Sequence, residues 1–441
     1  MGETETEAGE LLEVSASLKR NMRGIVPLWR RYLNLPRNVI VIGIVSLLND
    51  ASSEIVYPLL PFFLPAILGA SPAAIGVIEG AAECVSSLLK LFAGYFSDRR
   101  GRRKGLVVYG YAQSSFVRPL LAFAGSWYQV LAIRLTDRLG KGIRSAPRDA
   151  MIADAASVEE RGLAFGFHRA MDHAGAVAGP LLGLLILFLI ATNVEAPRAA
   201  DYTKLFLLAS LPAIASVAVA LFFLREMPGE LRADAKNLEP PRLSLSGFDS
   251  NFKRFLLIVS LFTLSNFSDM FLLIRAQNAG SGLATILLMW AALHTVKVLS
   301  SLVGGDLSDR VGRKGLIASG WLLRVSVYVG FAFVSSSGMV WLLFLIYGLY
   351  FGLAEGAEKA MVADLVRAEQ RGTAYGLYNL AFSLTVFPAS LLMGLVWNWR
   401  GARDAFILNA LIGLLAALLL LSLVKARPPA ERLDVEEALD G

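Results

Sequence analysis

The sequence predicts an all-α membrane protein in which twelve transmembrane helices form two pseudo-symmetric bundles of six. Three observations support this fold class. Hydrophobic residues make up 55% of the 441 residues and charged residues only 18%, whereas about 25% of residues are charged in soluble domains. Apolar segments near the roughly 20 residues that a membrane-spanning helix needs alternate with short polar connections. A basic string occurs once in each half, and its aspartates, Asp98 and Asp309, are about half of the chain length apart.

The elements follow in order along the chain. Residues 1–37 begin acidic and end basic, which predicts an N-terminal tail on the cytoplasmic side. A first six-helix bundle, 38–225, contains predicted spans at residues 39–66, 72–97, 105–124, 127–152, 162–191 and 204–225. The longest polar gap, residues 226–252, predicts a cytoplasmic linker. A second bundle, 253–424, contains spans at residues 253–277, 282–304, 315–334, 338–364, 372–396 and 402–424, and residues 425–441 form a cytoplasmic tail.

The connections between spans predict the orientation. Those around Gly69, Gly125, Gly280 and Ser336 carry no Lys or Arg, whereas the two strings are basic, as is typical of cytoplasmic loops. An even number of spans then places both termini in the cytoplasm of a protein of the plasma (inner) membrane. These loops account for the net charge of +6, so we expect no nucleic-acid partner. The single cysteine, Cys84, excludes an intrachain disulfide and a cysteine-rich metal site.

The two basic strings indicate a duplicated chain. The candidate gate residues are Gly94, Asp98, Arg99, Gly101, Arg102 and Arg103 in the first string, and Gly305, Asp309, Arg310, Gly312 and Arg313 in the second. A second pair of similar stretches, residues 148–154 and 358–364, repeats at nearly the same offset. Internal repeats of membrane helices are typical of transporters.

With these strings and this repeat, the chain resembles the major facilitator superfamily from about residue 38 to residue 425. The resemblance implies two bundles that rock about a site near the middle of the membrane. It also implies that the strings form a gate. Asp98 can accept hydrogen bonds from the N-terminal amides of a facing helix. Arg99, Arg102 and Arg103 can pair with carboxylates at the inner ends of neighbouring helices, of which Asp154 is the first candidate.

Span five carries a second resemblance. Its glycines and proline, Gly166, Gly175, Gly179, Pro180 and Gly183, are similar to the antiporter signature of the drug–proton exchangers in that superfamily, although Leu184 stands where the signature ends in glycine. Small residues let helices approach closely, and a proline bends a helix. The resemblance implies export in exchange for protons.

Ionisable residues within the spans usually face a cavity or a partner, because they are costly in a membrane. In the family that the chain resembles, spans one, four, seven and ten line the cavity. The candidates for coupling to protons are Asp50, Glu54, Asp172 and Glu355, and the candidates for binding substrate are Arg134, Arg138 and Asp269. Desolvation in a partly dry cavity favours the neutral form of a carboxylate, which suits proton exchange.

Two other interpretations of these charges stay open. Buried acids and bases can neutralise each other as pairs that fix helix registry, which is the expectation for Lys90, Asp137, Arg148, Asp149 and Arg169. His168 and Asp172 are four residues apart on one helix, but three histidines in the chain offer little for a metal site. We therefore expect no metal and no cofactor, with the proton as coupling ion.

The function that follows is secondary active transport of a small polar, anionic or amphipathic solute by alternating access, in a monomer surrounded by lipid. Proton-coupled efflux by antiport is the first expectation. Proton-coupled uptake (symport) of an anionic metabolite or metal chelate is the alternative, and a non-transporting receptor on the same scaffold is a further one. We expect no enzyme, because no set of nucleophile and base and no cofactor-binding loop occurs outside the spans.

Overall fold

A computed structural model describes residues 35–100, 103–157, 160–226, 244–367 and 370–425. All regular structure within these ranges is helical. Of the predicted gate residues, Gly101 and Arg102 lie outside the described ranges, as do the side chains of Asp98, Arg99, Asp309 and Arg310. Most of the predicted tails and linker lies outside as well, so the division into five regions stays a prediction.

The helices follow the twelve predicted spans. In the first half they are α3 (Arg37–Val56), the short 3-10 helix η1 (Tyr57–Leu59), α4 (Leu60–Leu68), α5 (Pro72–Arg100), α6 (Lys104–Val117), the 3-10 helix η2 (Arg118–Phe123), α7 (Trp127–Ala155), α8 (Arg161–Ile190) and α9 (Ala199–Phe223). In the second half they are α10 (Ser250–Leu264), α11 (Met270–Asn278), α12 (Leu283–Val311), α13 (Arg313–Phe333), α14 (Ser337–Asp364), α15 (Arg371–Arg400) and α16 (Ala402–Leu423).

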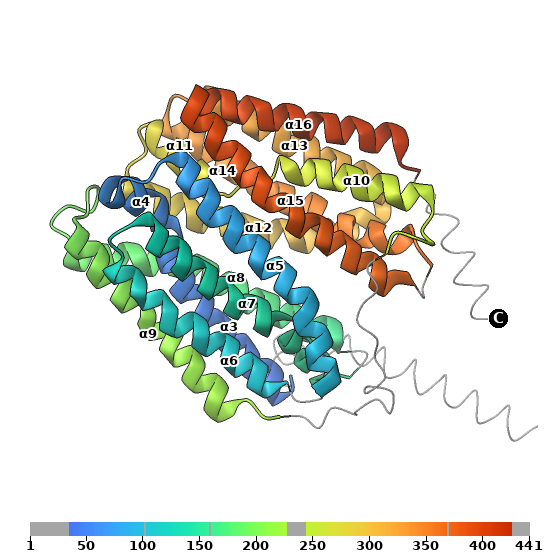
Figure 1. Cartoon of the computed structure of the whole chain (residues 1–441), viewed down its shortest axis with the longest axis horizontal. Helices are drawn as coiled ribbons and strands as arrows, with labels where there is room; N and C mark the ends of the chain where they lie inside the picture. Colours follow the sequence, from blue (N-terminus) through green and yellow to red (C-terminus); the bar gives the residue numbers. More distant parts are fainter. Residues whose placement is uncertain (1–34, 101–102, 158–159, 227–243, 368–369, 426–441) are drawn as a thin grey trace, which may run out of the picture.

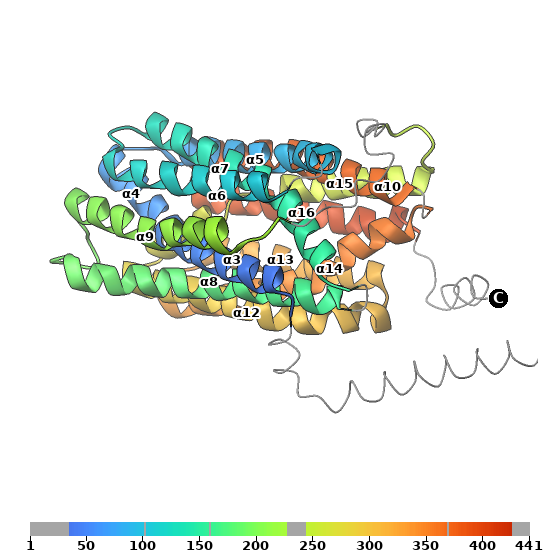
Figure 2. The same cartoon turned by 90° about the horizontal axis from the view of Figure 1, so that it is seen from below.

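Among the described residues, nine helical segments are long and apolar enough to cross a membrane. The other three spans are α6 with η2, α7, and α10 with α11. The first and third of these are interrupted, and α7 carries many charges. Figures 1 and 2 show that the helices run roughly parallel, with the blue-to-green first half beside the yellow-to-red second half. The predicted fold class is confirmed.

Span seven is not the continuous helix that residues 253–277 predict. α10 ends at Leu264 and α11 begins at Met270. Backbone groups within a membrane need hydrogen-bond partners, and polar side chains supply them at this break. The N–H of Ser268 donates to Oγ of Ser390 over 3.2 Å, and the N–H of Met270 donates to Oγ of Ser268 over 3.3 Å. Hydropathy alone did not reveal the break, because its apolar flanks dominate the average.

The basic strings are more helical than the cytoplasmic loops that the sequence predicts. α5 continues to Arg100 and α12 to Val311, so Gly94 and Gly305 lie within helices. Gly312 alone separates α12 from α13, with a φ of 91°. Few residues other than glycine adopt such a φ, which explains the glycine in the string.

The two halves contact each other mainly through two pairs of helices, α5 with α15 and α8 with α12. Within the first half, α3 packs on α8. A Cβ at Gly179 would lie 2.5 Å from Cβ of Glu54, and one at Gly175 would lie 3.1 Å from Cβ of Asp50. These glycines therefore let α8 approach α3 at the predicted proton-coupling residues.

The other residues of the antiporter-like pattern contribute less to this approach. Gly183 lies near the backbone of Ile55, and α8 continues through Pro180 without interruption. Gly166 has open space around it, so close packing does not explain this glycine.

Gly352 marks a close approach of α12 and α14, and its substitution tests that packing. A Cβ at Gly352 would overlap the carbonyl group of Ser300. We expect Gly352→Ala to destabilise the protein by about 1–3 kcal/mol, the usual effect of overpacking, measured by thermal unfolding in detergent. Gly356→Ala on the same helix is the matched control, because nothing lies within 4 Å of that position. Equal unfolding temperatures for the two variants would contradict the prediction.

Candidate functional site

A cavity of about 540 Å³ lies between the two halves of the chain. Its walls come from α3, α5 and α7 of the first half and from α12, α14 and α15 of the second. Six of the predicted site residues line it: Asp50, Glu54, Arg134, Arg138, Asp269 and Glu355. Its volume lies within the roughly 300–1,000 Å³ of small-molecule sites.

A second cavity of about 500 Å³ shares Glu83, Phe351 and Glu355 with the first. It extends toward the end of the bundle where the basic strings lie. There the side chains of Asp149 and Lys359 are each 50% exposed, whereas that of Glu79 in the first cavity is 6% exposed. The site is therefore open toward the end that carries the strings.

The opposite end of the bundle has a contact between the halves. Glu195, in the connection between α8 and α9, accepts a hydrogen bond from the backbone N–H of Leu283. Leu283 is the first residue of α12, and the N-terminus of a helix favours a negative charge. This contact helps to hold the halves together at that end.

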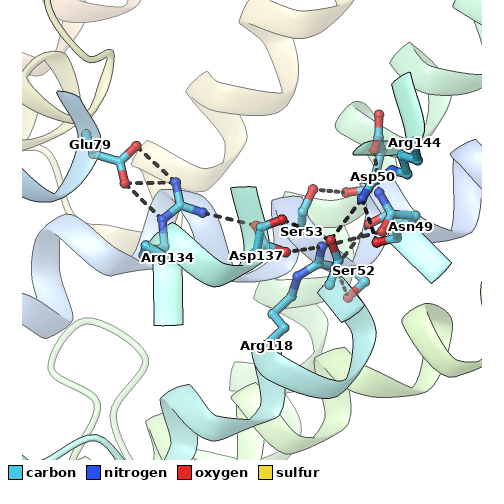
Figure 3. A network of polar contacts seen from close by, with 11 residues as sticks. Asn49, Asp50, Ser52, Ser53, Glu79, Arg118, Arg134, Asp137 and Arg144 are labelled. Carbon is cyan, nitrogen blue, oxygen red and sulfur yellow. Dashed lines mark hydrogen bonds and ion pairs between the residues drawn. The ribbon is translucent and has the colours of Figure 1, made fainter. Parts of the chain in front are cut away.

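Arg134, a predicted substrate ligand, is held in a buried ion pair (Figure 3). Its Nη2 lies 2.8 Å and 3.0 Å from the two carboxylate oxygens of Glu79, and its Nε donates to Oε1 over 3.0 Å. Its side chain is 7% exposed. The hydrogen bonds of the guanidinium are therefore directed to Glu79. A buried ion pair that fixes helix registry, one of the interpretations left open from the sequence, fits Arg134 better than substrate binding.

Arg118 and Asp137 form a second buried pair beside the first. Nη2 of Arg118 lies 3.1 Å from Oδ1 of Asp137, and its Nη1 donates to Oγ of Ser52 over 2.7 Å. Asn49 accepts further hydrogen bonds from Arg118 through its backbone and side-chain oxygens (Figure 3). This network ties α3, η2 and α7 together.

Asp50 and Glu54 lie one turn apart on α3 and face the cavity. Within the described residues neither makes an ion pair. Asp50 accepts a hydrogen bond from the Asn49 amide over 2.9 Å. Glu54 accepts one from Nε1 of Trp290 over 2.8 Å. Trp290 lies on α12, so this hydrogen bond crosses from one half to the other.

The second half contributes a cluster around Asp269. This carboxylate lies 3.5 Å from Nζ of Lys297 and accepts a hydrogen bond from Tyr347 over 2.7 Å. The ammonium group of Lys297 also lies 3.8 Å from the ring centre of Phe351. Asp269 is thus partly neutralised where it lines the cavity.

Two predicted proton-coupling residues lie away from the deep part of the cavity. Glu355 pairs with Arg169 of the other half and with Lys359, each over 2.9 Å, and its side chain is 43% exposed. Asp172 does not line the cavity and lies 3.5 Å from Nε2 of His168. His168 also contacts Oγ of Ser46 over 2.9 Å. Asp172 and Glu355 remain candidates for proton coupling, and Glu355 also forms a contact between the halves.

The basic strings have matching partners in the two halves. Arg103 pairs with Asp154, the partner proposed from the sequence. Arg313 pairs with Asp364 over 2.5 Å at the equivalent place in the second repeat. Each pair joins a string to the end of a helix two spans later, which suits a role in gating.

Sequence reasoning missed several residues of the site. Arg118 is the one charged residue of its predicted span, and that isolation was the signal that could have found it. Trp290 and Tyr347 carry no charge and looked like ordinary aromatic residues of membrane helices. Their partners, Glu54 and Asp269, became apparent only in three dimensions.

Comparison with known proteins gives consistent matches. The family model described as Major Facilitator Superfamily matches residues 42–390 and 280–439. An uncharacterised MFS-type transporter of Methanocaldococcus jannaschii is 34% identical over 393 residues, covering 88% of this chain and 95% of the relative. The class B tetracycline resistance protein of Escherichia coli is 24% identical over 375 residues, covering 80% and 87% of the two chains.

A solved structure is similar in fold. The bacterial homologue of the human lysosomal transporter Spinster, in its inward-facing and occupied conformation, superimposes with a TM-score of 0.69 at 16% identity. The match covers 90% of this chain and 97% of that chain.

Proposed function

This chain belongs to the major facilitator superfamily, and from that premise we propose that it exports a small polar, anionic or amphipathic solute in exchange for protons. The family and the fold identify a membrane transporter rather than an enzyme. The proposal concerns the solute, the coupling ion and the direction.

One observation carries the proposal: carboxylates and cations without ion-pair partners line the same cavity. Asp50 and Glu54 make no ion pair in the described part of the chain, and neither do Arg138 and Lys141 on α7. Buried charges are normally paired. In this cavity a carboxylate can therefore bind a proton and a cation can bind an anionic solute, so that the protein carries proton and solute in alternation.

The contacts between the halves suit alternating access. Glu54 with Trp290 and Tyr57 with Ser268 join the two halves and would have to break when the closed end opens. Arg169 with Glu355 joins the halves nearer the open end. Because we place the basic strings in the cytoplasm, the described conformation opens inward. Protonation of Glu54 would weaken its hydrogen bond with Trp290, since a neutral acid is a poorer acceptor than a carboxylate.

Export is supported by the similarity of the span-five glycines to the antiporter signature, and two of these glycines, Gly175 and Gly179, pack against Asp50 and Glu54. The similarity to a relative named for tetracycline resistance adds some support. Uptake of an anionic metabolite with protons is the second candidate. The cations of α7 favour it equally, because they suit an anion moving in either direction.

Purified protein in liposomes with a trapped pH-sensitive dye tests the proposal. When a transported solute is added outside and moves in along its gradient, antiport drives protons out and raises the luminal pH. Symport lowers the luminal pH, and liposomes without protein are the control. Solute movement with no change of luminal pH would contradict proton coupling.

A further inference from the structure

Two buried groups of the cavity have no hydrogen-bond partner, and they come from opposite halves. The first is the guanidinium of Arg138, through its Nε. The second is the imidazole of His294, through both ring nitrogens. Both residues line the cavity of about 540 Å³. Buried polar atoms are nearly always hydrogen-bonded, so unpartnered ones call for an explanation. A solute that fills the cavity can supply the missing partners.

Arg138 differs from the arginines beside it. Arg134 is occupied by Glu79, Arg118 by Asp137, and Arg144 by Ser114 over 2.8 Å and by the ring of Tyr111. Arg138 makes no ion pair with any described residue. Its planar fork of donors matches a carboxylate, which can accept two parallel hydrogen bonds from it.

The carboxylates nearby favour a single negative charge on the solute. Asp50, Glu54 and Glu83 line the same cavity and make no ion pair with a described residue. A solute with two negative charges, such as a phosphate monoester, would be repelled more strongly by these groups than a carboxylate would.

Flat aromatic surfaces lie beside the unpartnered groups. His294 meets the ring of Trp290 edge to face, with 5.0 Å between centres, and Trp290 lies 5.7 Å from Tyr57. The hydrogen bond from Trp290 to Glu54 holds the indole in place. Phe351 lines both cavities. A planar ring can pack against such surfaces.

From these observations, and resting on the proposed transport function, we propose that the solute is an aromatic carboxylate with a hydrogen-bonding ring substituent. Its carboxylate binds Arg138, its ring packs against Trp290 and Phe351, and its substituent bonds to His294. The solute thus bridges α7 of one half and α12 of the other.

Titration calorimetry with purified full-length protein in detergent at neutral pH tests this, with salicylate as the probe. Compared with salicylate, benzoate lacks the substituent and salicylamide lacks the charge; compared with benzoate, cyclohexanecarboxylate lacks the aromatic ring. We expect salicylate to bind most tightly. Salicylamide should bind at least about tenfold more weakly than salicylate, and cyclohexanecarboxylate at least about tenfold more weakly than benzoate, as loss of a charged hydrogen bond or of ring packing implies.

Two variants separate the contacts. Arg138→Gln should weaken salicylate and benzoate alike by about tenfold or more. His294→Phe should weaken salicylate but leave benzoate unchanged, a result that general misfolding would not produce. Arg400→Gln, at the end of α15 where Arg400 packs on Trp399, is the control and should bind as the unmodified protein does.

The proposal is overturned if salicylate and benzoate both fail to bind at millimolar concentration, or if the neutral salicylamide binds as tightly as salicylate. It is also overturned if both variants bind salicylate normally. Binding needs no proton gradient, so its failure is distinct from failure of the proposed antiport. If salicylate binds but its transport in liposomes moves no protons, the antiport proposal fails and the proposed binding site stands.

Discussion

Glu54→Gln is expected to abolish transport driven by the pH gradient while leaving exchange of solute across the membrane intact. The amide of glutamine cannot bind and release a proton at neutral pH. Its oxygen can still accept the hydrogen bond that Trp290 donates to Glu54 over 2.8 Å, so the contact between the halves is kept. In liposomes, accumulation against a gradient should be lost and equilibrium exchange should continue, with salicylate as the first solute to test.

Two further variants show whether the loss of proton coupling is due to the Glu54 carboxylate itself. Trp290→Phe removes the donor and keeps the titrating carboxylate, so it should alter the exchange rate and retain proton dependence. Asp50→Asn tests the other carboxylate on the same face of α3. Should Glu54→Gln keep an unchanged pH profile, Glu54 is not the coupling residue. Asp50 is then the next candidate, followed by Asp172 and Glu355.

Arg134→Gln is expected to destabilise the protein by about 3–5 kcal/mol, the effect of removing one partner from a buried ion pair. The Glu79 carboxylate, whose side chain is 6% exposed, would lose the cation that now donates three hydrogen bonds to it. Thermal unfolding in detergent measures the change. Arg169→Gln is the matched control, because its pair with Glu355 is exposed and such surface pairs contribute about 0–1 kcal/mol.

A double variant, Glu79→Gln with Arg134→Met, tests whether the loss of stability comes from the unpaired charge that Arg134→Gln leaves on Glu79. Because it leaves no unpaired charge, it should recover much of the stability that Arg134→Gln loses. If Arg134→Gln unfolds at the same temperature as the unmodified protein, the pair is not a structural tie. Arg134 then returns to the substrate-binding role that its place in the sequence suggested.

Hydropathy and the repeated strings predicted the fold well, because both are properties of short segments that can be read without knowing the tertiary structure. Nine helical segments of the described ranges are apolar over a spanning length, and the strings recur at one offset in the chain. The break between Leu264 and Met270 was missed, since its stability depends on Ser390, which is remote in sequence. Cavity-lining positions were also predictable: the candidates on spans one, four, seven and ten do line the cavity.

The sequence by itself determined that this protein is a duplicated bundle of membrane helices, and its resemblance to a known family indicated four of the spans that line the central site, to which the structure adds α5, α12 and α15. The tertiary structure alone decided which charges are satisfied there. Arg134 and Arg138 lie one turn apart on α7 and look alike in the sequence, yet Glu79 pairs with the first and leaves the second open. The physical reason is that a buried charge is governed by the groups within a few ångströms of it. In a bundle those groups come from helices that are far apart along the chain.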